Sequence, residues 1–255
     1  HNKGEQSYYN NYTKENVYRL KLIDRMGTRM AVENGGLQVN NPTQMIVPTA
    51  YEQTVHFEKQ QFSDRLGYQI YQKFTQGLPM RYDREDVLFW KSINAPDLNI
   101  TPFELEYPVN MNTRYFSAKI SLFGSSYKEY PFNQPDHHAI IRVNSALINN
   151  KWWSKQTECI FENMTQTQNS HLNHGTNYLY IDLPGDTPSA YFEQIFLDYF
   201  QLTYWREYKS SKNELKFSKP SNKGFGLYQF EISNFTDENV SLYKIGSSVF
   251  SNLTI

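Results

Sequence analysis

The stretch DHHAIIRVNSALINNKWW, residues 136–153, sets the class of fold. Apolar and polar side chains alternate along it with period two, which is typical of a half-buried strand. Comparable short segments, separated by polar, Gly, Pro or Asn breaks, occur at 114–126, 157–164, 177–186 and 195–205. Closely spaced strands without a long helix between them favour two packed sheets over βαβ units. The sequence therefore predicts an all-β protein with a jelly-roll β-sandwich.

Composition supports this prediction and narrows the class of partner. The 255 residues include 20 tyrosines and 17 phenylalanines, which suit pleated and half-buried surfaces. With 25 basic and 26 acidic side chains, the net charge of −1 provides no general attraction for a polyanion, so we expect no nucleic-acid partner. No apolar run reaches the roughly 18 residues of a membrane helix, so we expect no membrane span.

The histidine and tryptophan pairs of the first stretch raise the question of a site. His137 and His138 are adjacent on a strand, so their rings should point to opposite faces, with one buried and the other solvated. In the doublet Trp152–Trp153, one ring should likewise point inward. These tryptophans, together with Tyr127 and Tyr130, serve either core packing or a platform for carbohydrate or a protein partner. Metal or catalytic use of the histidines lacks a supporting carboxylate or thiolate pattern.

Candidate catalytic groups are sparse. The single cysteine, Cys159, lies between Glu158 and Glu162, which should raise rather than lower its pKa, so we expect a structural thiol and no enzyme activity. Arg206 and Lys209 follow the last long strand and are expected at a solvated edge. Residues 61–90 are compatible with either a short helix or an irregular loop.

A succession of motifs extends this picture: YTKENVYRLKL (12–22), TVHFEKQ (54–60), DVLFWKSI (86–93), FSAKISLFGSS (116–126), DHHAIIRVNSALINNKWW (136–153), NHGTNYLYIDLPGDTPS (173–189), FEQIFLDYFQLTYWREY (192–208), NELKFSK (213–219) and YQFEISNFTDENVSLYKIG (228–246). Their order resembles the region upstream of the catalytic domain in gingipain-type cysteine peptidases, the group that includes the sortase-like peptidases of the type IX secretion system. The resemblance implies a non-catalytic scaffold or recognition domain, a secreted or outer-membrane-surface location in a bacterium, and a downstream peptidase domain of the same protein as partner.

The resemblance also implies how the chain is divided. Residues 1–50, with a strand at 16–23, and residues 209–255 would supply N- and C-terminal strands to a smaller β unit, with the jelly roll at 51–208 inserted between them.

The alternative function is an autonomous jelly-roll carbohydrate-binding module. The final strand IFLDYFQLTY and the early segment HFEK are similar to segments that hold a structural calcium in such modules, which implies Glu58 and Asp198 as ligands. Calcium takes about six to eight oxygens, of which these two carboxylates supply only the charged part. The other interpretation is that both carboxylates cap turns or pair with basic residues.

Overall fold

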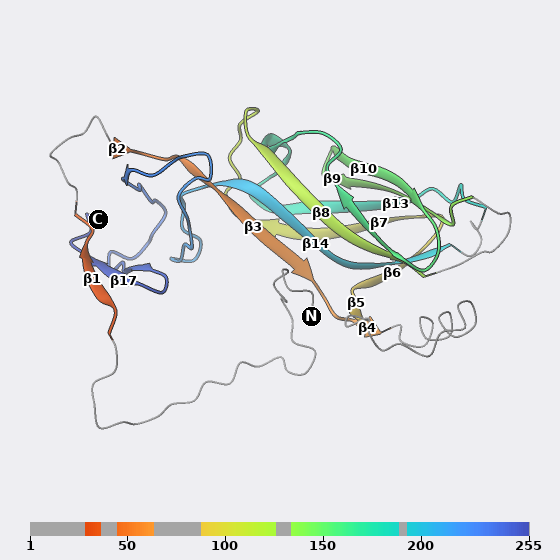
Figure 1. Cartoon of the computed structure of the whole chain (residues 1–255), viewed down its shortest axis with the longest axis horizontal. Helices are drawn as coiled ribbons and strands as arrows, with labels where there is room; N and C mark the ends of the chain where they lie inside the picture. Colours follow the sequence, from red (N-terminus) through yellow and green to blue (C-terminus); the bar gives the residue numbers. More distant parts are fainter. Residues whose placement is uncertain (1–28, 37–44, 64–87, 126–133, 189–192, 255) are drawn as a thin grey trace, which may run out of the picture. The chain divides into compact units, whose positions relative to one another are not determined.

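The computed structural model describes residues 29–36, 45–63, 88–125, 134–188 and 193–254. The chain forms two compact units, one of residues 41–236 and a smaller one of residues 1–40 and 237–255. Figure 1 labels the strands of both units. The predicted strand at 16–23 and most of the ambiguous segment at 61–90 lie outside the described residues. Among the residues that the structure describes, none forms a helix with the length and apolar character needed to cross a bilayer.

Two sheets form the larger unit. The first has the strand order β10 (Ala146–Trp153), β9 (His137–Val143), β13 (Gly175–Leu183) and β7 (Asp97–Leu105). The second has the order β11 (Glu158–Glu162), β8 (Tyr115–Gly124), β14 (Gln194–Glu207) and β3 (Ala50–Glu58), with β12 (Thr167–Gln168) beside β8 and β6 (Lys91–Asn94) beside β14. Short pairs, β2 (Met45–Ile46) with β15 (Leu227–Tyr228) and β4 (Phe62–Ser63) with β5 (Leu88–Phe89), complete the unit together with a 3-10 turn, η2 (Asn169–His171).

The chain passes repeatedly from one sheet to the other. It runs from β7 in the four-stranded sheet to β8 in the six-stranded sheet, returns through β9 and β10, crosses again to β11, and repeats the exchange with β13 and β14. The sandwich pairings are antiparallel. This arrangement confirms the predicted all-β jelly-roll sandwich.

The core lies between the two sheets, because alternate side chains of each strand point inward. One continuous cluster joins Leu179 and Ile181 of β13 to Ile120 of β8 and Phe200 of β14, all of them fully buried. Phe200 lies at its centre, with ring centroids 4.7 Å from Phe57, 5.2 Å from Phe103 and 5.6 Å from Trp90. Removing this much apolar area from water is the principal stabilising contribution to the fold.

Two irregularities in strand pairing change the directions in which side chains point. The pairing of β10 with β9 shifts between Leu147 and Asn149, and that of β14 with β8 shifts between Leu197 and Phe200. An extra residue in one strand changes which face the following side chains occupy. After the first shift, Trp152 is exposed and Trp153 packs against the core.

Strands from the two ends of the chain make up the smaller unit. β1 (Ala31–Asn34) pairs in parallel with β17 (Ser248–Ser251), which pairs in turn with the antiparallel β16 (Leu242–Lys244). The backbone N–H of Gly35 donates to the carbonyl of Ser251, and the Ser248 hydroxyl donates to Glu33. This pairing confirms the predicted small β unit formed by N- and C-terminal strands. Residues 41–50 and 209–236 group with the sandwich.

Candidate functional site

The two adjacent histidines lie on opposite faces of the four-stranded sheet, as their spacing predicts. His137 pairs with Trp153 and His138 with Trp152 across β9 and β10. The expectation that one imidazole is solvated is wrong, because His137 and His138 expose only 0% and 4% of their surfaces. His137 points to the core side and lies so close to Gly124 that a Cβ there would overlap its ring. His138 is on the outer face but is covered by its neighbours.

Trp152 and His138 form a stacked pair on this outer face. Their ring centroids are 3.7 Å apart and the rings lie 10° from parallel. Although His138 covers one face of the indole, 46% of the surface of Trp152 stays exposed. The uncovered ring surface is a flat apolar platform, the kind of surface on which another ring or an apolar C–H face can stack.

Polar groups fix the imidazole beneath this platform. Nδ1 of His138 lies 2.7 Å from Oδ1 of Asp186, and Nε2 lies 2.7 Å from Oδ1 of Asn150. The side chain of Asp186 is 47% exposed and Asn150 is also exposed, so both flank the platform with groups that reach solvent. The site therefore combines a rigid aromatic surface with hydrogen-bonding groups beside it.

A buried carboxylate supports the histidine strand from behind. Glu193, 1% exposed, accepts hydrogen bonds from the His138 backbone N–H at 2.8 Å and from the Thr187 hydroxyl at 2.9 Å. Burial raises the pKa of Glu193, and these two hydrogen bonds oppose the shift. Its Oε1 also lies 4.0 Å from Nδ1 of His137. Glu193 thus ties the start of β9 to the segment before β14.

The other predicted aromatic residues are placed differently. Trp153 is half-buried, 4.9 Å from the ring of His137 and 5.8 Å from that of Phe161, so it contributes to packing under the sheet. Tyr127 and Tyr130 lie outside the described residues. Of the two tryptophans, Trp152 is the one that the structure places at the surface with a supporting polar shell.

The two proposed calcium ligands, Glu58 and Asp198, come from the adjacent strands β3 and β14 of the other sheet. Glu58 is paired in register with Tyr199, and Asp198 occupies the irregular step of β14. The Glu58 carboxylate lies 2.8 Å from Nε2 of His56, and Oδ2 of Asp198 accepts from the Ser121 hydroxyl at 3.3 Å. Within the described ranges, no three His, Cys, Asp or Glu side chains are grouped to hold a metal ion. The two carboxylates alone do not make a calcium shell.

The remaining nucleophilic and imidazole groups are dispersed. Cys159 is half-buried against the core, and burial raises the pKa of its thiol, aided by Glu158 and opposed by Lys151. His171 lies 3.0 Å from the Ser145 hydroxyl, and His174 stacks on Tyr107 at 4.1 Å. Among the described residues, none of these contacts joins the thiol of Cys159 to an imidazole.

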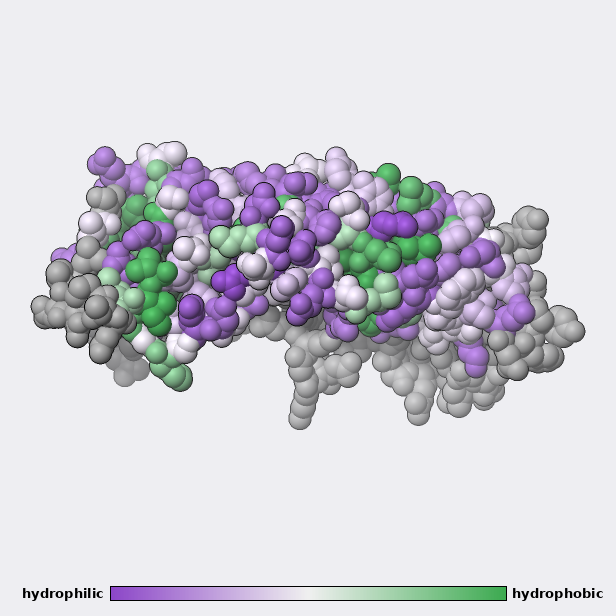
Figure 2. Space-filling model, turned by 90° about the horizontal axis from the view of Figure 1, so that it is seen from above, coloured by the Kyte–Doolittle hydropathy of each residue, from purple (hydrophilic) through white to green (hydrophobic). Residues whose placement is uncertain are grey.

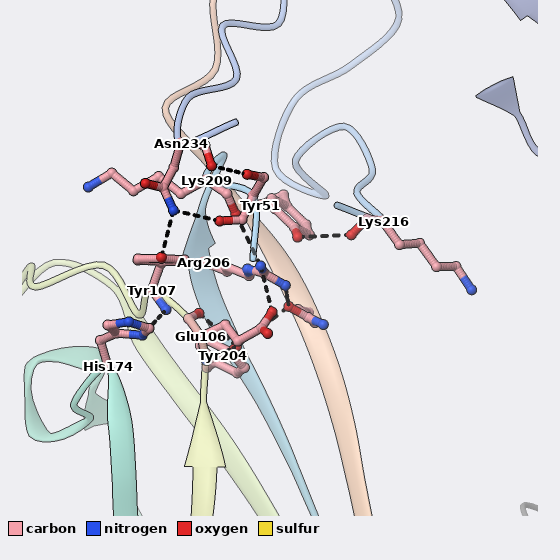
Figure 3. A network of polar contacts seen from close by, with 11 residues as sticks. Tyr51, Glu106, Tyr107, His174, Tyr204, Arg206, Lys209, Lys216 and Asn234 are labelled. Atoms are coloured by element: carbon pink, nitrogen blue, oxygen red, sulfur yellow. Dashed lines mark hydrogen bonds and ion pairs between the residues drawn. The ribbon is translucent and has the colours of Figure 1, made fainter. Parts of the chain in front are cut away.

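A polar network at the end of the sandwich was not predicted. Figure 3 shows Arg206 at its centre, and the expectation of a solvated Arg206 is wrong, because 3% of this residue is exposed. Its guanidinium donates to Gln53 Oε1 at 2.8 Å and to the Lys209 carbonyl at 3.1 Å, and it pairs with Glu106 at 2.7 Å. Phe200, Leu202 and Tyr204 of β14 point inward, and the same period of two carries Arg206 inward at the strand end. That period was the available signal.

Further contacts join the segment after β14 to the sandwich. The Asn234 amide donates to the Tyr107 hydroxyl at 2.8 Å and to the Ser210 carbonyl at 2.9 Å (Figure 3). The hydroxyl of Tyr51 donates to the carbonyl of Lys216 at 2.9 Å, and its ring lies 4.9 Å from that of Tyr208. Lys209, the other residue expected at a solvated edge, keeps 43% of its side chain exposed while pairing with Glu207. Residues 209–236 are thereby anchored to the sandwich.

The surface is otherwise mixed in character. On the face seen in Figure 2, hydrophobic residues gather in separate clusters between hydrophilic ones. Exposed large apolar side chains on the sandwich include Leu98, Ile100, Leu147, Trp152 and Tyr178, which belong to the four-stranded sheet. The outer face of this sheet is therefore the richest exposed apolar surface among the described strands.

Comparisons with known proteins give similarity at the level of structure. No family model matches the chain, and no curated protein matches its sequence. The crystal structure of dimeric latent PorU from Porphyromonas gingivalis is similar with a TM-score of 0.52 and 12% sequence identity, over 80% of this chain and 17% of that one. This chain thus matches about a sixth of the length of PorU.

Two carbohydrate-binding modules of the CBM36 type show weaker similarity. One is in complex with calcium and xylotriose, with a TM-score of 0.29 and 9% identity over 44% of this chain and 77% of that one. The other comes from a xylanase of the Trinervitermes trinervoides hindgut metagenome, with a TM-score of 0.32 and 6% identity over 59% and 95%. Of the three, only the PorU similarity is high enough to support a shared fold, and it concerns the fold alone.

Proposed function

We propose that the chain is a non-catalytic scaffold and recognition region of a gingipain-type peptidase associated with type IX secretion, located outside the cell or on the outer surface of a bacterium. The observation that carries this proposal is the similarity to PorU, which extends over 80% of this chain but only 17% of PorU. A supporting domain is expected to match only a small part of a larger protein, as this chain does with PorU. The order of sequence motifs points to the same class of protein.

The contacts around Arg206 suggest how such a scaffold works. Its buried guanidinium, together with Tyr51 and Asn234, fixes residues 209–236 against the end of the sandwich. A segment held at several points is a firm part of the sandwich, because its backbone and side chains are both restrained. A peptidase domain of the same protein is the proposed partner of this scaffold.

Peptide hydrolysis tests the proposal directly. The purified chain should not cleave a mixture of fluorogenic peptides with basic, acidic and apolar residues at the cleaved bond. Cys159→Ala should give the same baseline. Cleavage by the purified chain that disappears in Cys159→Ala would overturn the proposal, because it would make the half-buried thiol a nucleophile.

A second candidate function is carbohydrate binding, favoured by the Trp152 platform. The indole stacks on a fixed imidazole and keeps 46% of its surface exposed, with Asp186 and Asn150 beside it. Sugar rings offer apolar C–H faces for stacking and hydroxyls for the flanking groups. In this candidate, Glu58 and Asp198 would contribute two carboxylates to a structural calcium site.

A polysaccharide-binding assay and calorimetry test the two parts of this second candidate separately. If the chain binds glycan, at least one polysaccharide should retain it, and the same polysaccharide should not retain Trp152→Ala. Calcium binding predicts a lower Tm after chelation, restored by calcium but not by magnesium and absent in Asp198→Asn. A Tm that chelation leaves unchanged would contradict calcium binding. If no polysaccharide retains the chain, glycan binding is contradicted.

A further inference from the structure

A second aromatic feature lies on the same outer face as Trp152. Tyr178 and Tyr180 of β13 both point outward, with ring centroids 6.2 Å apart, and Tyr178 is 41% exposed. They line an open hollow of about 540 Å³ together with Asn144, Ser145, His171 and Asn173. The hollow thus presents two phenol rings on one side and hydroxyl, imidazole and amide groups on the other.

Hydrogen bonds hold the floor of this hollow in place. The Asn144 amide donates to the His171 carbonyl and to Asn177 Oδ1, both at 2.8 Å, and Asn144 Oδ1 accepts from the Tyr178 N–H at 2.9 Å. Ser145 and His171 contact each other at 3.0 Å. These contacts fix the turn between β9 and β10 against β13, so the lining groups are preorganised before a ligand arrives.

Strand register gives the relation of this hollow to Trp152. Tyr180 lies opposite Arg142 of β9, and Trp152 lies opposite His138 of the same strand from the other side. Four residues along β9 and two strand spacings across the sheet place the Cα atoms of Tyr180 and Trp152 about 16 Å apart. A single sugar ring cannot contact both, whereas an extended chain of several rings can.

The groups between these two ends suit an uncharged ligand. Ile140 of β9 is half-buried and lies opposite Asn150, giving an apolar and a polar contact midway. Arg142 is 3.8 Å from Asp182, which matches one pair of charges along this path. Asp186 lies 2.7 Å from Nδ1 of His138, an imidazole that is charged only when protonated, so this carboxylate keeps its negative charge beside the platform when the imidazole is neutral. The polar groups of the hollow itself are hydroxyl, amide and imidazole groups. A neutral polyhydroxylated chain can donate hydroxyl hydrogen bonds to the Asp186 carboxylate, whereas an anionic chain would be repelled by it.

We propose that the outer face of the four-stranded sheet is an elongated binding track for a neutral polysaccharide, with one subsite at Trp152 and a second in the Tyr178–Tyr180 hollow. The proposal rests on the second candidate function and adds the second subsite and the extended form of the ligand. Its signature is a dependence of affinity on chain length, because only a ligand that spans both subsites gains both sets of contacts.

The test uses the 255-residue chain on an array of neutral polysaccharides: β-1,4- and β-1,3-glucans, xylan, mannan and dextran, with polygalacturonate as an anionic comparison. The mono- to hexasaccharide series of the retained polymer is then titrated by calorimetry. We expect affinity to rise up to the length that spans the track and then to level off. Trp152→Ala and Tyr180→Ala should each weaken binding of the longest oligosaccharide about tenfold or more. The control is Tyr115→Ala, because Tyr115 is 41% exposed, like Tyr178, but belongs to β8 of the other sheet. This control should leave affinity unchanged.

The outcomes distinguish the track from the site on which it rests. If Trp152→Ala abolishes binding while Tyr178→Ala and Tyr180→Ala leave it unchanged, the second subsite is wrong and glycan binding at Trp152 stands. If no neutral polysaccharide binds the chain, or if polygalacturonate alone binds it, both the extended track and neutral-glycan binding at Trp152 are wrong. A further outcome is that no polysaccharide on the array binds the chain, while the double variant Trp152→Ala/Tyr180→Ala of the full-length protein breaks the contact between the sandwich and the peptidase domain. The face would then be a protein interface, and the glycan track would be refuted. Circular dichroism confirms that each variant is folded.

Discussion

Replacing Arg206 by methionine should destabilise the sandwich strongly. Methionine keeps much of the apolar volume but cannot donate, so Gln53 Oε1 and the Lys209 carbonyl lose their charged partner. Hydrogen bonds from a charged donor contribute about 1.5–3 kcal/mol each to stability. Glu106 is 43% exposed and can be hydrated after the change, so losing its ion pair adds about 1 kcal/mol at most. Relief of the desolvation of the guanidinium offsets part of the loss.

The net expectation is a fall of about 3 kcal/mol in the free energy of unfolding, because the lost hydrogen bonds outweigh the relief of desolvation. For a unit of this size that corresponds to a fall in Tm of about 6–12 °C. Calorimetry and urea unfolding measure the change, and Arg142→Met serves as the matched control, since the Arg142 side chain is 41% exposed and its ion pair is 3.8 Å long. The control should stay within about 0.5 kcal/mol of the wild type. Limited proteolysis should also show faster cleavage within 209–236 in Arg206→Met. A variant within about 1 kcal/mol of the wild type, with unchanged proteolysis, would refute the role assigned to Arg206.

Three other predictions concern the sandwich itself. Burial raises the pKa of Glu193, so the folded state binds this proton more tightly than the unfolded state, and this contribution to stability is lost as pH rises from about 4.5 through the raised value. The Tm of Glu193→Gln should therefore rise relative to that of the wild type as pH increases from about 4 to 8. Curves of Tm against pH that stay parallel for the two proteins would contradict this. Phe200→Ala should cost about 3–5 kcal/mol by urea unfolding, and a loss below about 2 would mean that the centre of the core lies elsewhere. Iodoacetamide should alkylate Cys159 in the native protein at pH 8 about tenfold or more slowly than in urea, because burial raises its pKa, whereas equal rates would show an accessible thiolate.

The strand pattern was readable from the sequence because it depends on local alternation. The predicted strand segments contain Ile141, Leu179 and Phe200 of the core, and the two tryptophans separated into one exposed and one packed ring, as expected. The pairing of the chain ends followed from element order, although the strand that performs it is Ala31–Asn34. The strand pattern and the separation of the two tryptophans need no knowledge of which distant segments meet.

The contacts that build the candidate sites depend on such distant segments. His138 was expected to be either buried or solvated according to its strand face alone, whereas its burial comes from Trp152 and from Asp186, 48 positions away. Arg206 was expected in solvent because charged residues at strand ends usually are, but Gln53 of β3 lies 153 positions away and accepts its hydrogen bond. The Tyr178–Tyr180 hollow likewise depends on the loops around Ser145 and His171. Each case is decided by contacts between segments that are distant in the chain, and these contacts cannot be read from a single sequence.

The coding sequence that follows the codon for Ile255 tests the central claim most directly. A scaffold and recognition region of a gingipain-type peptidase predicts an open reading frame that continues into a peptidase domain with a catalytic histidine and cysteine. Replacing that cysteine in the full-length protein should abolish peptide cleavage while leaving the sandwich folded. A stop codon at that point, or a continuation into a domain of another class, would contradict the claim.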